Sequence, residues 1–305
     1  MAINNVTVLG AGNLGAQIAF RAAYFGKNVT SYDINEEALA AAKGRFEMIA
    51  ENYKRDVEAT DEQVAAAFEH LTQSSDLLAA VADADLVIEA IPEVLELKRK
   101  TFTQIKDVLK PEAILVSNSS TLPPSVMVEF TGRPEKFMNF HFANDIHVMN
   151  IVEVMPHKGT SKETYDAVAG FAPEMGMRPI LLKKEQPGYI INTLLVPWLE
   201  AGAELWVKGI ADVATIDGTA AGITNSPRFA PFRTYDIVGA GVAYAVSSMN
   251  PDPVMQEFAR RLKEDFIDKG KLGVETKEGF YVYGDDGEVL GLSEQAKHEY
   301  DTSMF

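Results

Sequence analysis

Short β-branched runs alternate with longer helical stretches up to about residue 183, and this alternation limits the fold more than any other feature. Apolar residues at helical spacing fill residues 13–26, 35–55, 94–109 and 161–174. Strands alternating with helices favour an α/β domain built around a mainly parallel sheet. The strands predicted from these runs cover residues 5–10, 28–33, 85–90, 113–119, 137–142, 150–155 and 178–182.

The pattern changes after Pro187 and Gly188, which mark a turn. Strand signals nearly vanish beyond it, and residues 189–209 form a long apolar stretch with helical spacing. A helix that is apolar nearly all round is buried in a bundle or at a subunit interface. We therefore predict two domains, a sheet domain over residues 1–184 and an all-helical domain over residues 185–305.

Composition excludes several classes of function. The net charge is −16, which disfavours binding to the phosphates of nucleic acid. No apolar run approaches the 18 or so residues of a membrane span, and the N-terminus lacks the pattern of a signal peptide. Cysteine is absent, which fits a reducing compartment. We expect a cytoplasmic protein, and no His, Asp and Glu cluster has the spacing of a metal site, so no metal is expected.

A glycine turn follows the first predicted strand and opens the first helix. Gly10, Gly12 and Gly15, with Asn13 and Leu14 between them, form G-x-G-x-x-G. Such a turn lets a pyrophosphate approach the backbone at a helix N-terminus. Asp33 ends the second strand, where a carboxylate holds ribose hydroxyls and repels a 2′-phosphate. The sequence thus predicts a Rossmann-type domain that binds NAD rather than NADP.

His141 lies in the apolar run "FMNFHF", and Glu153 follows twelve residues later in "NIVEVM". Removal of a proton as hydride leaves an alcohol is a reaction that histidine suits. A carboxylate on the other ring nitrogen would fix the tautomer and stabilise the imidazolium. The residues by themselves leave another interpretation open, a hydrogen-bonded core histidine with Glu153 facing solvent.

The motifs "SNSSTL" (117–122), "FHFAND" (140–145), "NIVEVM" (150–155) and "QPGYIINTLLVPWLEA" (186–201) together resemble the L-3-hydroxyacyl-CoA dehydrogenases, including 3-hydroxybutyryl-CoA dehydrogenases. The resemblance covers nearly the whole chain. It implies that His141 is the catalytic base and Glu153 its partner. It also implies that Ser120 and Asn192 hydrogen-bond the reacting substrate oxygens and that the helical domain forms a homodimer. Contacts to the cofactor are implied for Ala90, Glu93, Lys98, Asn118 and Asn144.

Departures from the family pattern concern the substrate. Members that take coenzyme A thioesters usually carry lysines on the long helix after the second strand. Here that helix has Lys43, Arg45, Lys54 and Arg55 among several acids, and Glu275 stands where lysine is common. The turn at 225–239 also differs, although Pro231, Phe232 and Asp236 are retained.

Three functions therefore remain open. A short-chain 3-hydroxyacyl-CoA dehydrogenase is favoured, because "SNSSTL", "HF" and "LLVPWLEA" are nearest to the thioester branch. A dehydrogenase of a 3-hydroxy acid without coenzyme A, of the gulonate or carnitine type, is the alternative that "VEVMPH" suggests. The third is a non-catalytic NAD-binding protein, which retention of the four polar site residues argues against.

Overall fold

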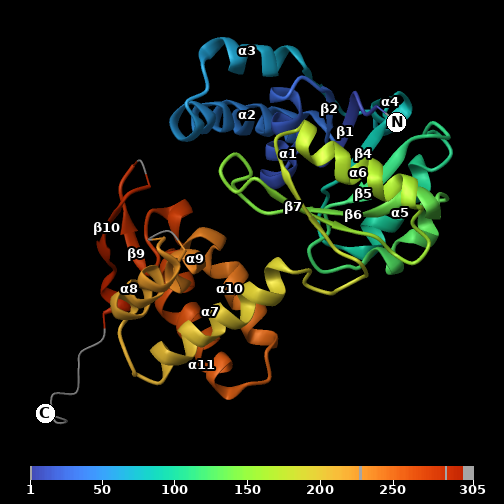
Figure 1. Cartoon of the computed structure of the whole chain (residues 1–305). Helices are drawn as coiled ribbons and strands as arrows, with labels where there is room; N and C mark the ends of the chain where they lie inside the picture. Colours follow the sequence, from blue (N-terminus) through green and yellow to red (C-terminus); the bar gives the residue numbers. More distant parts are fainter. Residues whose placement is uncertain (1, 227–228, 286, 298–305) are drawn as a thin grey trace, which may run out of the picture. The chain divides into compact units, whose positions relative to one another are not determined.

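The computed structural model describes residues 2–226, 229–285 and 287–297. The chain divides into two compact units, Met1–Ile191 and Asn192–Phe305. Figure 1 labels the α-helices and many of the strands of both units. Residues 227 and 228 of the altered turn at 225–239 lie outside the described residues.

Among the described residues of the first unit, eight strands form one sheet in the spatial order β3-β2-β1-β4-β5-β6-β7-β8. Neighbouring strands are parallel except β6 and β7, which are antiparallel. The first six positions follow the strand order of a dinucleotide-binding Rossmann fold. The strands are β1 (Asn5–Leu9), β2 (Asn28–Tyr32), β3 (Leu71–Ser74), β4 (Leu86–Glu89), β5 (Ile114–Ser117), β6 (Phe137–Phe142), β7 (Ile151–Met155) and β8 (Arg178–Leu181).

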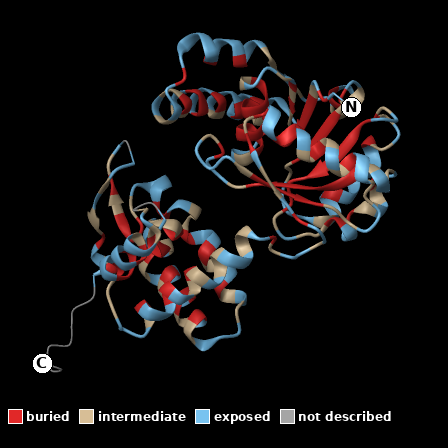
Figure 2. Cartoon of the chain, viewed as in Figure 1, coloured by how far each residue is buried: buried red, intermediate tan, exposed pale blue. Residues whose placement is uncertain are grey.

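Helices cover both faces of this sheet, and the central strands are buried, as the red ribbons of Figure 2 show. Side chains alternate between the two faces: Val8 and Ile88 pack into one core, and Leu9 and Val87 into the other. Burial on both faces explains why the strands read as apolar runs. On the first face lie α1 (Asn13–Tyr24), α2 (Glu36–Val57), α3 (Asp61–Glu69) and α6 (Lys162–Glu174), and on the second α4 (Leu77–Ala82) and α5 (Leu95–Ile105).

Three elements of this unit were not predicted from the sequence: β3, α3 and α4. Strand β3 is a four-residue edge strand with only one apolar residue, Leu71, and its pairing with β2 stabilises it. Helix α4 has six residues and is capped at its N-terminus by Asp76, whose carboxylate accepts hydrogen bonds from the backbone N–H groups of Leu78 and Ala79. Elements this short lack a periodic signal, so tertiary contacts decide them.

The second unit is mainly helical and has its own core. Its helices are α7 (Ile191–Val207), whose first residue belongs to the first unit, α8 (Val213–Thr224), α9 (Pro231–Val238), α10 (Ala240–Met249) and α11 (Pro253–Arg261). The aromatic rings of Trp206, Phe232 and Phe280 pack together at its centre. A short antiparallel pair, β9 (Tyr281–Tyr283) and β10 (Val289–Leu292), adds strand structure to a unit expected to be all helical.

Buried carboxylates join the helices of the second unit to β9. Asp236 accepts hydrogen bonds from the backbone N–H groups of Phe280 and Tyr281 and from the Tyr283 hydroxyl, at 2.8 to 2.9 Å. Asp236 is 4% exposed, and burial raises its pKa to about 6 although these hydrogen bonds act in the other direction. Asp236 therefore serves the packing of this unit.

Among the described residues, no helix combines the length and the apolar character needed to cross a membrane.

Candidate active site

The glycine turn between β1 and α1 has a separate physical role for each glycine. Gly10 has φ +97°, and a Cβ there would lie 2.6 Å from the carbonyl oxygen of Ala90. A Cβ on Gly15 would lie 1.9 Å from the carbonyl oxygen of Gly10. A Cβ on Gly12 would meet no protein atom within 4 Å. The first and third glycines therefore let α1 pack on the sheet, and Gly12 leaves open the space in which a pyrophosphate would lie.

Asp33 follows β2 and lines a cleft of about 890 Å³ together with Gly10, Ile34 and Ile91. Its carboxylate accepts the backbone N–H of Ala11 at 2.9 Å and that of Ile34 at 2.7 Å. Each carboxylate oxygen keeps a lone pair for a ribose hydroxyl. These residues fit the adenosine half of NAD.

The remaining turn residues lie where the pyrophosphate would meet α1. Asn13 and Leu14 form its first two residues, and no backbone acceptor within the helix is available to N–H groups of a first turn. Asn13 is exposed and Leu14 half-buried. Ala90 follows β4 and donates its backbone N–H to the Leu9 carbonyl at 2.8 Å. The fold thus presents a helix N-terminus and an open glycine to an anion, and the chain binds NAD.

His141 and Glu153 face each other across the antiparallel pair β6 and β7. The strand register places them directly opposite, so their side chains leave the sheet on the same face. Nδ1 of His141 lies 3.0 Å from Oε2 of Glu153. His141 is 5% exposed and Glu153 fully buried. This geometry removes the alternative of a glutamate that faces solvent.

The other oxygen of Glu153 is held by backbone donors. Oε1 accepts the N–H groups of Ile190 and Ile191 at 2.8 and 2.9 Å, where α7 begins. With His141, three donors converge on one carboxylate, at the end of a helix that favours negative charge. The chain segment before α7 therefore fixes the position of the glutamate.

Ser120 lies on the other side of the imidazole. Its hydroxyl is 3.2 Å from Nε2 of His141. Because Nδ1 donates its N–H to Glu153, the neutral imidazole presents Nε2 as an acceptor, and Ser120 then donates to it. The structure thus brings together three residues predicted from the sequence, with Nε2 as the nitrogen that can take up a proton.

Glu93 and Lys98 belong to a polar network beneath the Ser120 loop. Oε1 of Glu93 accepts from the Ser119 hydroxyl at 2.5 Å and from the Thr121 backbone N–H at 2.8 Å. Burial acts to raise the pKa of Glu93, but these hydrogen bonds and the Lys98 ammonium lower it to about 2. Nζ of Lys98 lies 3.1 Å from Glu93 and 2.6 Å from Glu89. Lys98 is 1% exposed, so its expected contact with the cofactor stays a prediction.

The three predicted asparagines differ in position. The side-chain oxygen of Asn118 accepts the backbone N–H of Phe142 at 2.8 Å and so joins the carboxyl ends of β5 and β6. Asn144 is exposed on the loop after β6. Asn192 is half-buried on α7 and is the first residue of the second unit. The roles of Asn144 and Asn192 stay predictions.

Sequence reasoning missed Glu89 and Tyr189, which the structure places around these groups, and it considered Arg45 only as a cation for coenzyme A. Glu89 is fully buried at the end of β4, where it accepts from Lys98 and from the Ser117 hydroxyl at 2.5 Å, and burial raises its pKa. Arg45 on α2 donates to the Ala11 carbonyl of the glycine turn at 3.0 Å. Tyr189 lies against the His141 ring. Only Glu89, an acid ending an apolar run, carries a sequence signal that could have found it.

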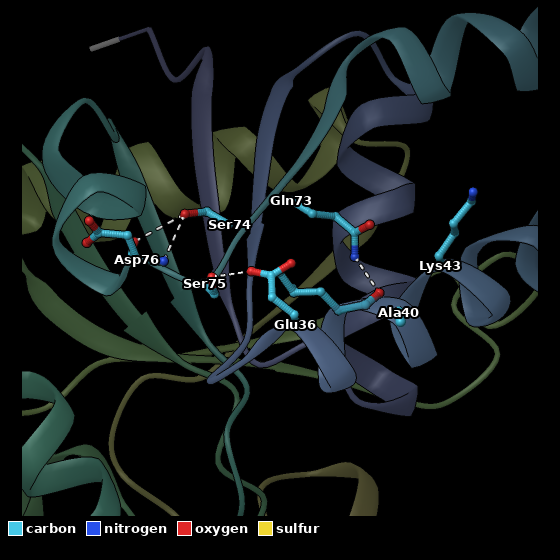
Figure 3. A pocket seen from close by; sticks show the side chains of 8 residues that line it. Glu36, Ala40, Lys43, Gln73, Ser74, Ser75 and Asp76 are labelled. Atoms are coloured by element: carbon cyan, nitrogen blue, oxygen red, sulfur yellow. Dashed lines mark hydrogen bonds between the residues drawn. The ribbon is translucent and has the colours of Figure 1, made fainter.

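A second hollow, of about 510 Å³, lies at the start of α2 and shares Ser75 and Asp76 with the dinucleotide cleft. Figure 3 shows Lys43 at its edge and the hydrogen bond from Ser75 to Glu36, which is 2.5 Å long. Two carboxylates, of Glu36 and Asp76, line it beside one lysine. This mixed lining does not favour a polyanion.

No group of three or more histidine, aspartate and glutamate side chains within the described part of the chain could hold a metal ion.

The dinucleotide cleft and the paired histidine lie at the carboxyl edge of the parallel strands. Residues 10, 33 and 118 directly follow such strands, and residue 141 is near the end of one. Ligands of such sheets bind at this edge. A histidine paired with a buried carboxylate at this edge suits the proton transfer that accompanies hydride transfer. The fold and its NAD-binding family model define an NAD-dependent dehydrogenase.

Family models identify the particular group. Residues 5–186 match the 3-hydroxyacyl-CoA dehydrogenase NAD-binding domain, and residues 188–283 match the 3-hydroxyacyl-CoA dehydrogenase C-terminal domain. The chain belongs to the 3-hydroxyacyl-CoA dehydrogenase family. The resemblance, the fold class and the NAD cofactor predicted from the sequence are thereby confirmed.

Curated relatives agree with this assignment. The mitochondrial hydroxyacyl-coenzyme A dehydrogenase of Rattus norvegicus is 33% identical over 291 residues, covering 92% of this chain and 91% of the relative. A probable 3-hydroxybutyryl-CoA dehydrogenase of Deinococcus radiodurans is 31% identical over 288 residues, covering 90% of this chain and 99% of the relative.

Solved structures include a diketoreductase reported to show substrate-directed dual catalysis of dicarbonyl compounds. It is 51% identical with a TM-score of 0.87, and the match covers 93% of this chain and 100% of that chain. The (S)-3-hydroxybutyryl-CoA dehydrogenase of Ralstonia eutropha is 27% identical with a TM-score of 0.77, again covering 93% and 100%.

Proposed function

We propose that the protein interconverts short-chain L-3-hydroxyacyl-CoA and 3-ketoacyl-CoA with NAD, and that His141 is the general base. The observation that supports this proposal most is the hydrogen-bonded series Ser120–His141–Glu153, at 3.2 and 3.0 Å, in a chain of this family. It combines an acceptor nitrogen, a buried acid that orients it and a hydroxyl beside it.

In the oxidation, Nε2 of His141 accepts the proton of the 3-hydroxyl group as the C3–H bond breaks. Bound NAD supplies the acceptor for the hydride. Glu153 stabilises the imidazolium, and its two backbone donors keep it in place during the charge change. In the reduction, the imidazolium returns the proton to the oxygen. Ser120, now hydrogen-bonded to Nε2, would turn to the substrate oxygen, with Asn192 as a second donor.

His141→Ala tests the base. We expect a loss of roughly 10²- to 10⁴-fold in kcat, because general acid–base catalysis contributes that much. NADH binding, measured by fluorescence titration, stays close to wild type because His141 does not line the cleft that fits the adenosine half of NAD. His70→Ala, at the end of α3, is the control and keeps full activity. Turnover by His141→Ala within tenfold of wild type would reject the mechanism.

A second candidate, a dehydrogenase of carbonyl substrates without coenzyme A, is favoured by the state of two of the four cations on α2, Lys54 and Arg55. Lys54 lies 3.1 Å from Glu51 and 2.7 Å from Asp61, and Arg55 lies 2.8 Å from Asp56. Cations already paired with acids give little net attraction to a phosphate. The 51% identical diketoreductase, which acts on dicarbonyl compounds, points in the same direction.

A comparison of three substrates separates the two candidates. Acetoacetyl-CoA, its N-acetylcysteamine thioester and 2,4-pentanedione share the reacting carbonyl, but only the first carries the nucleotide. Recognition of coenzyme A predicts a kcat/KM for acetoacetyl-CoA about 100-fold above the truncated thioester, about 2.7 kcal/mol. Equal values for the two thioesters would mean that the nucleotide is not bound. Turnover of the diketone alone would establish the second candidate.

We further propose a cytoplasmic homodimer that forms through the second unit. Exposed apolar side chains follow one face of α10 at helical spacing, namely Val242, Val246 and Met249, which are 57%, 46% and 78% exposed. Ile223 on α8 is 81% exposed. Apolar side chains gathered in this way are typical of a protein interface. Light scattering of wild type and Val246→Glu tests it, and a monomeric wild type would reject it.

A further inference from the structure

Tyr189 is a buried residue held in an uncommon backbone conformation. It lies between Gly188 and the start of α7, is 1% exposed and has φ +53°. Non-glycine residues adopt positive φ rarely, and a large aromatic residue has an energetic cost there. Other contacts of this residue must therefore stabilise the conformation.

The ring of Tyr189 stacks on the imidazole of His141. The ring centroids are 4.4 Å apart and the planes differ by 18°. The face of a phenol ring carries negative electrostatic potential, so it attracts a cation placed on it. It therefore stabilises the imidazolium more than the neutral imidazole, and it also restricts rotation of the histidine ring.

The hydroxyl of the same residue is hydrogen-bonded to the loop that carries Ser120, on one side directly and on the other through Asn139. It donates to the carbonyl of Ser119 and accepts from the side-chain amide of Asn139 at 2.7 Å. That amide also donates to the carbonyl of Leu122 at 2.9 Å. The loop that carries Ser120 is thus tied down by Tyr189 and by Asn139. Burial raises the pKa of Tyr189, so the hydroxyl remains a donor.

The segment also holds the acid, because the next two backbone N–H groups, of Ile190 and Ile191, bind Glu153. We propose that Tyr189 is a positioning residue, which sets the plane of His141 through its ring and the place of Ser120 through its hydroxyl. This inference rests on the proposed role of His141 as base. The ring and the hydroxyl of Tyr189 thus have separate functions, and different substitutions can remove them one at a time.

Tyr189→Phe removes the hydroxyl and keeps the ring. We expect kcat to fall about tenfold, because the loop that carries Ser120 loses its hydrogen bond from Tyr189 to the Ser119 carbonyl. The acid limb of the pH profile of kcat/KM should not move. Tyr189→Leu removes the ring too. The imidazolium then loses its stacked partner, so the acid limb moves to lower pH by about half a unit to one unit. The assay runs in the oxidation direction, in which His141 must be neutral, with the hydroxy counterpart of the fastest of the three substrates compared above.

Tyr165→Phe is the matched control. Its hydroxyl donates to the carbonyl of Leu182 at 3.1 Å, but its ring does not contact His141. It should keep wild-type kcat and pH profile. NADH titration and thermal melting test whether each variant is folded. If the leucine variant does not fold, Tyr189→Trp, which keeps an aromatic face without the hydroxyl, replaces it beside Tyr189→Phe. It should then keep the acid limb and lose kcat as phenylalanine does.

The results distinguish this inference from the proposed function. If His141→Ala loses activity, two results overturn the positioning role alone. One is an unmoved acid limb in Tyr189→Leu, and the other is a wild-type kcat in Tyr189→Phe. Where leucine does not fold, a moved acid limb or wild-type kcat in Tyr189→Trp overturns it equally. Full activity in His141→Ala overturns the proposed base, and the inference with it.

Discussion

Replacement of Glu153 by glutamine tests the chemistry of the site with almost no change of shape. One oxygen of Glu153 accepts the backbone N–H groups of Ile190 and Ile191, and the other accepts from Nδ1 of His141 at 3.0 Å. A glutamine side chain has one oxygen and one NH₂ group. The oxygen must face the two backbone donors, because those donors cannot turn away, and the NH₂ group then faces His141.

The consequence for His141 is a change of tautomer. An NH₂ group opposite Nδ1 requires Nδ1 to be an acceptor, so the ring proton moves to Nε2. Nε2 can then no longer take the proton of the substrate, and the imidazolium has lost its counter-charge. The equivalent amide substitution in a serine protease triad lowers kcat about 10⁴-fold. We expect a loss of roughly 10³- to 10⁴-fold for Glu153→Gln, about 4 to 5.5 kcal/mol of transition-state stabilisation.

NADH absorbance gives kcat for oxidation of the hydroxy counterpart of the fastest substrate, and NADH titration should give a dissociation constant close to wild type. Nitrogen NMR of the histidine ring should show the proton on Nε2 in the variant and on Nδ1 in wild type. Glu174→Gln, which removes an exposed ion pair with Lys27, is the control and keeps full activity. A kcat of Glu153→Gln within tenfold of wild type, or an unchanged tautomer, would refute the reasoning.

Three further predictions concern the cofactor site and the second unit. Gly12→Ala should weaken NADH binding without lowering the melting temperature, because its Cβ meets no protein atom. Gly15→Ala places a Cβ 1.9 Å from a carbonyl oxygen, so it should lower both the affinity for NADH and the melting temperature. Identical behaviour of the two variants in titration and melting would contradict this. Arg45→Met should weaken NADH binding about two- to fivefold and reduce its salt dependence, because a cation beside the glycine turn is lost; an unchanged affinity at low salt rejects this role. The pKa of Asp236 is raised from 3.8 to about 6, so its contribution to stability is complete below about pH 4 and is lost as the pH rises through 6. Urea unfolding, followed by the fluorescence of Trp198 and Trp206 on α7, should show the free energy of unfolding fall by up to about 3 kcal/mol over this range. Asp236→Asn should not show this fall.

The sequence by itself determined the class of fold and the position of the cofactor turn. Seven of the strands in the main sheet have apolar runs long enough to be recognised, and the glycine turn combines a strand end, a helix start and an acid at the next strand end. These signals are local, since each depends on residues adjacent in the chain. Strand β3, helices α3 and α4 and the β9–β10 pair were missed because they are short or polar and depend on neighbours.

Only the tertiary structure decided how the site is assembled. The spacing of His141 and Glu153 is compatible with many registers, and the antiparallel pairing of β6 with β7 selects the one that places them opposite. Ser120 reaches His141 from the loop after β5, and Tyr189 reaches Asn139 from 50 residues away. Hydrophobic periodicity tells which face of an element is buried but not which element lies against it, and the catalytic contacts depend on that choice of neighbour.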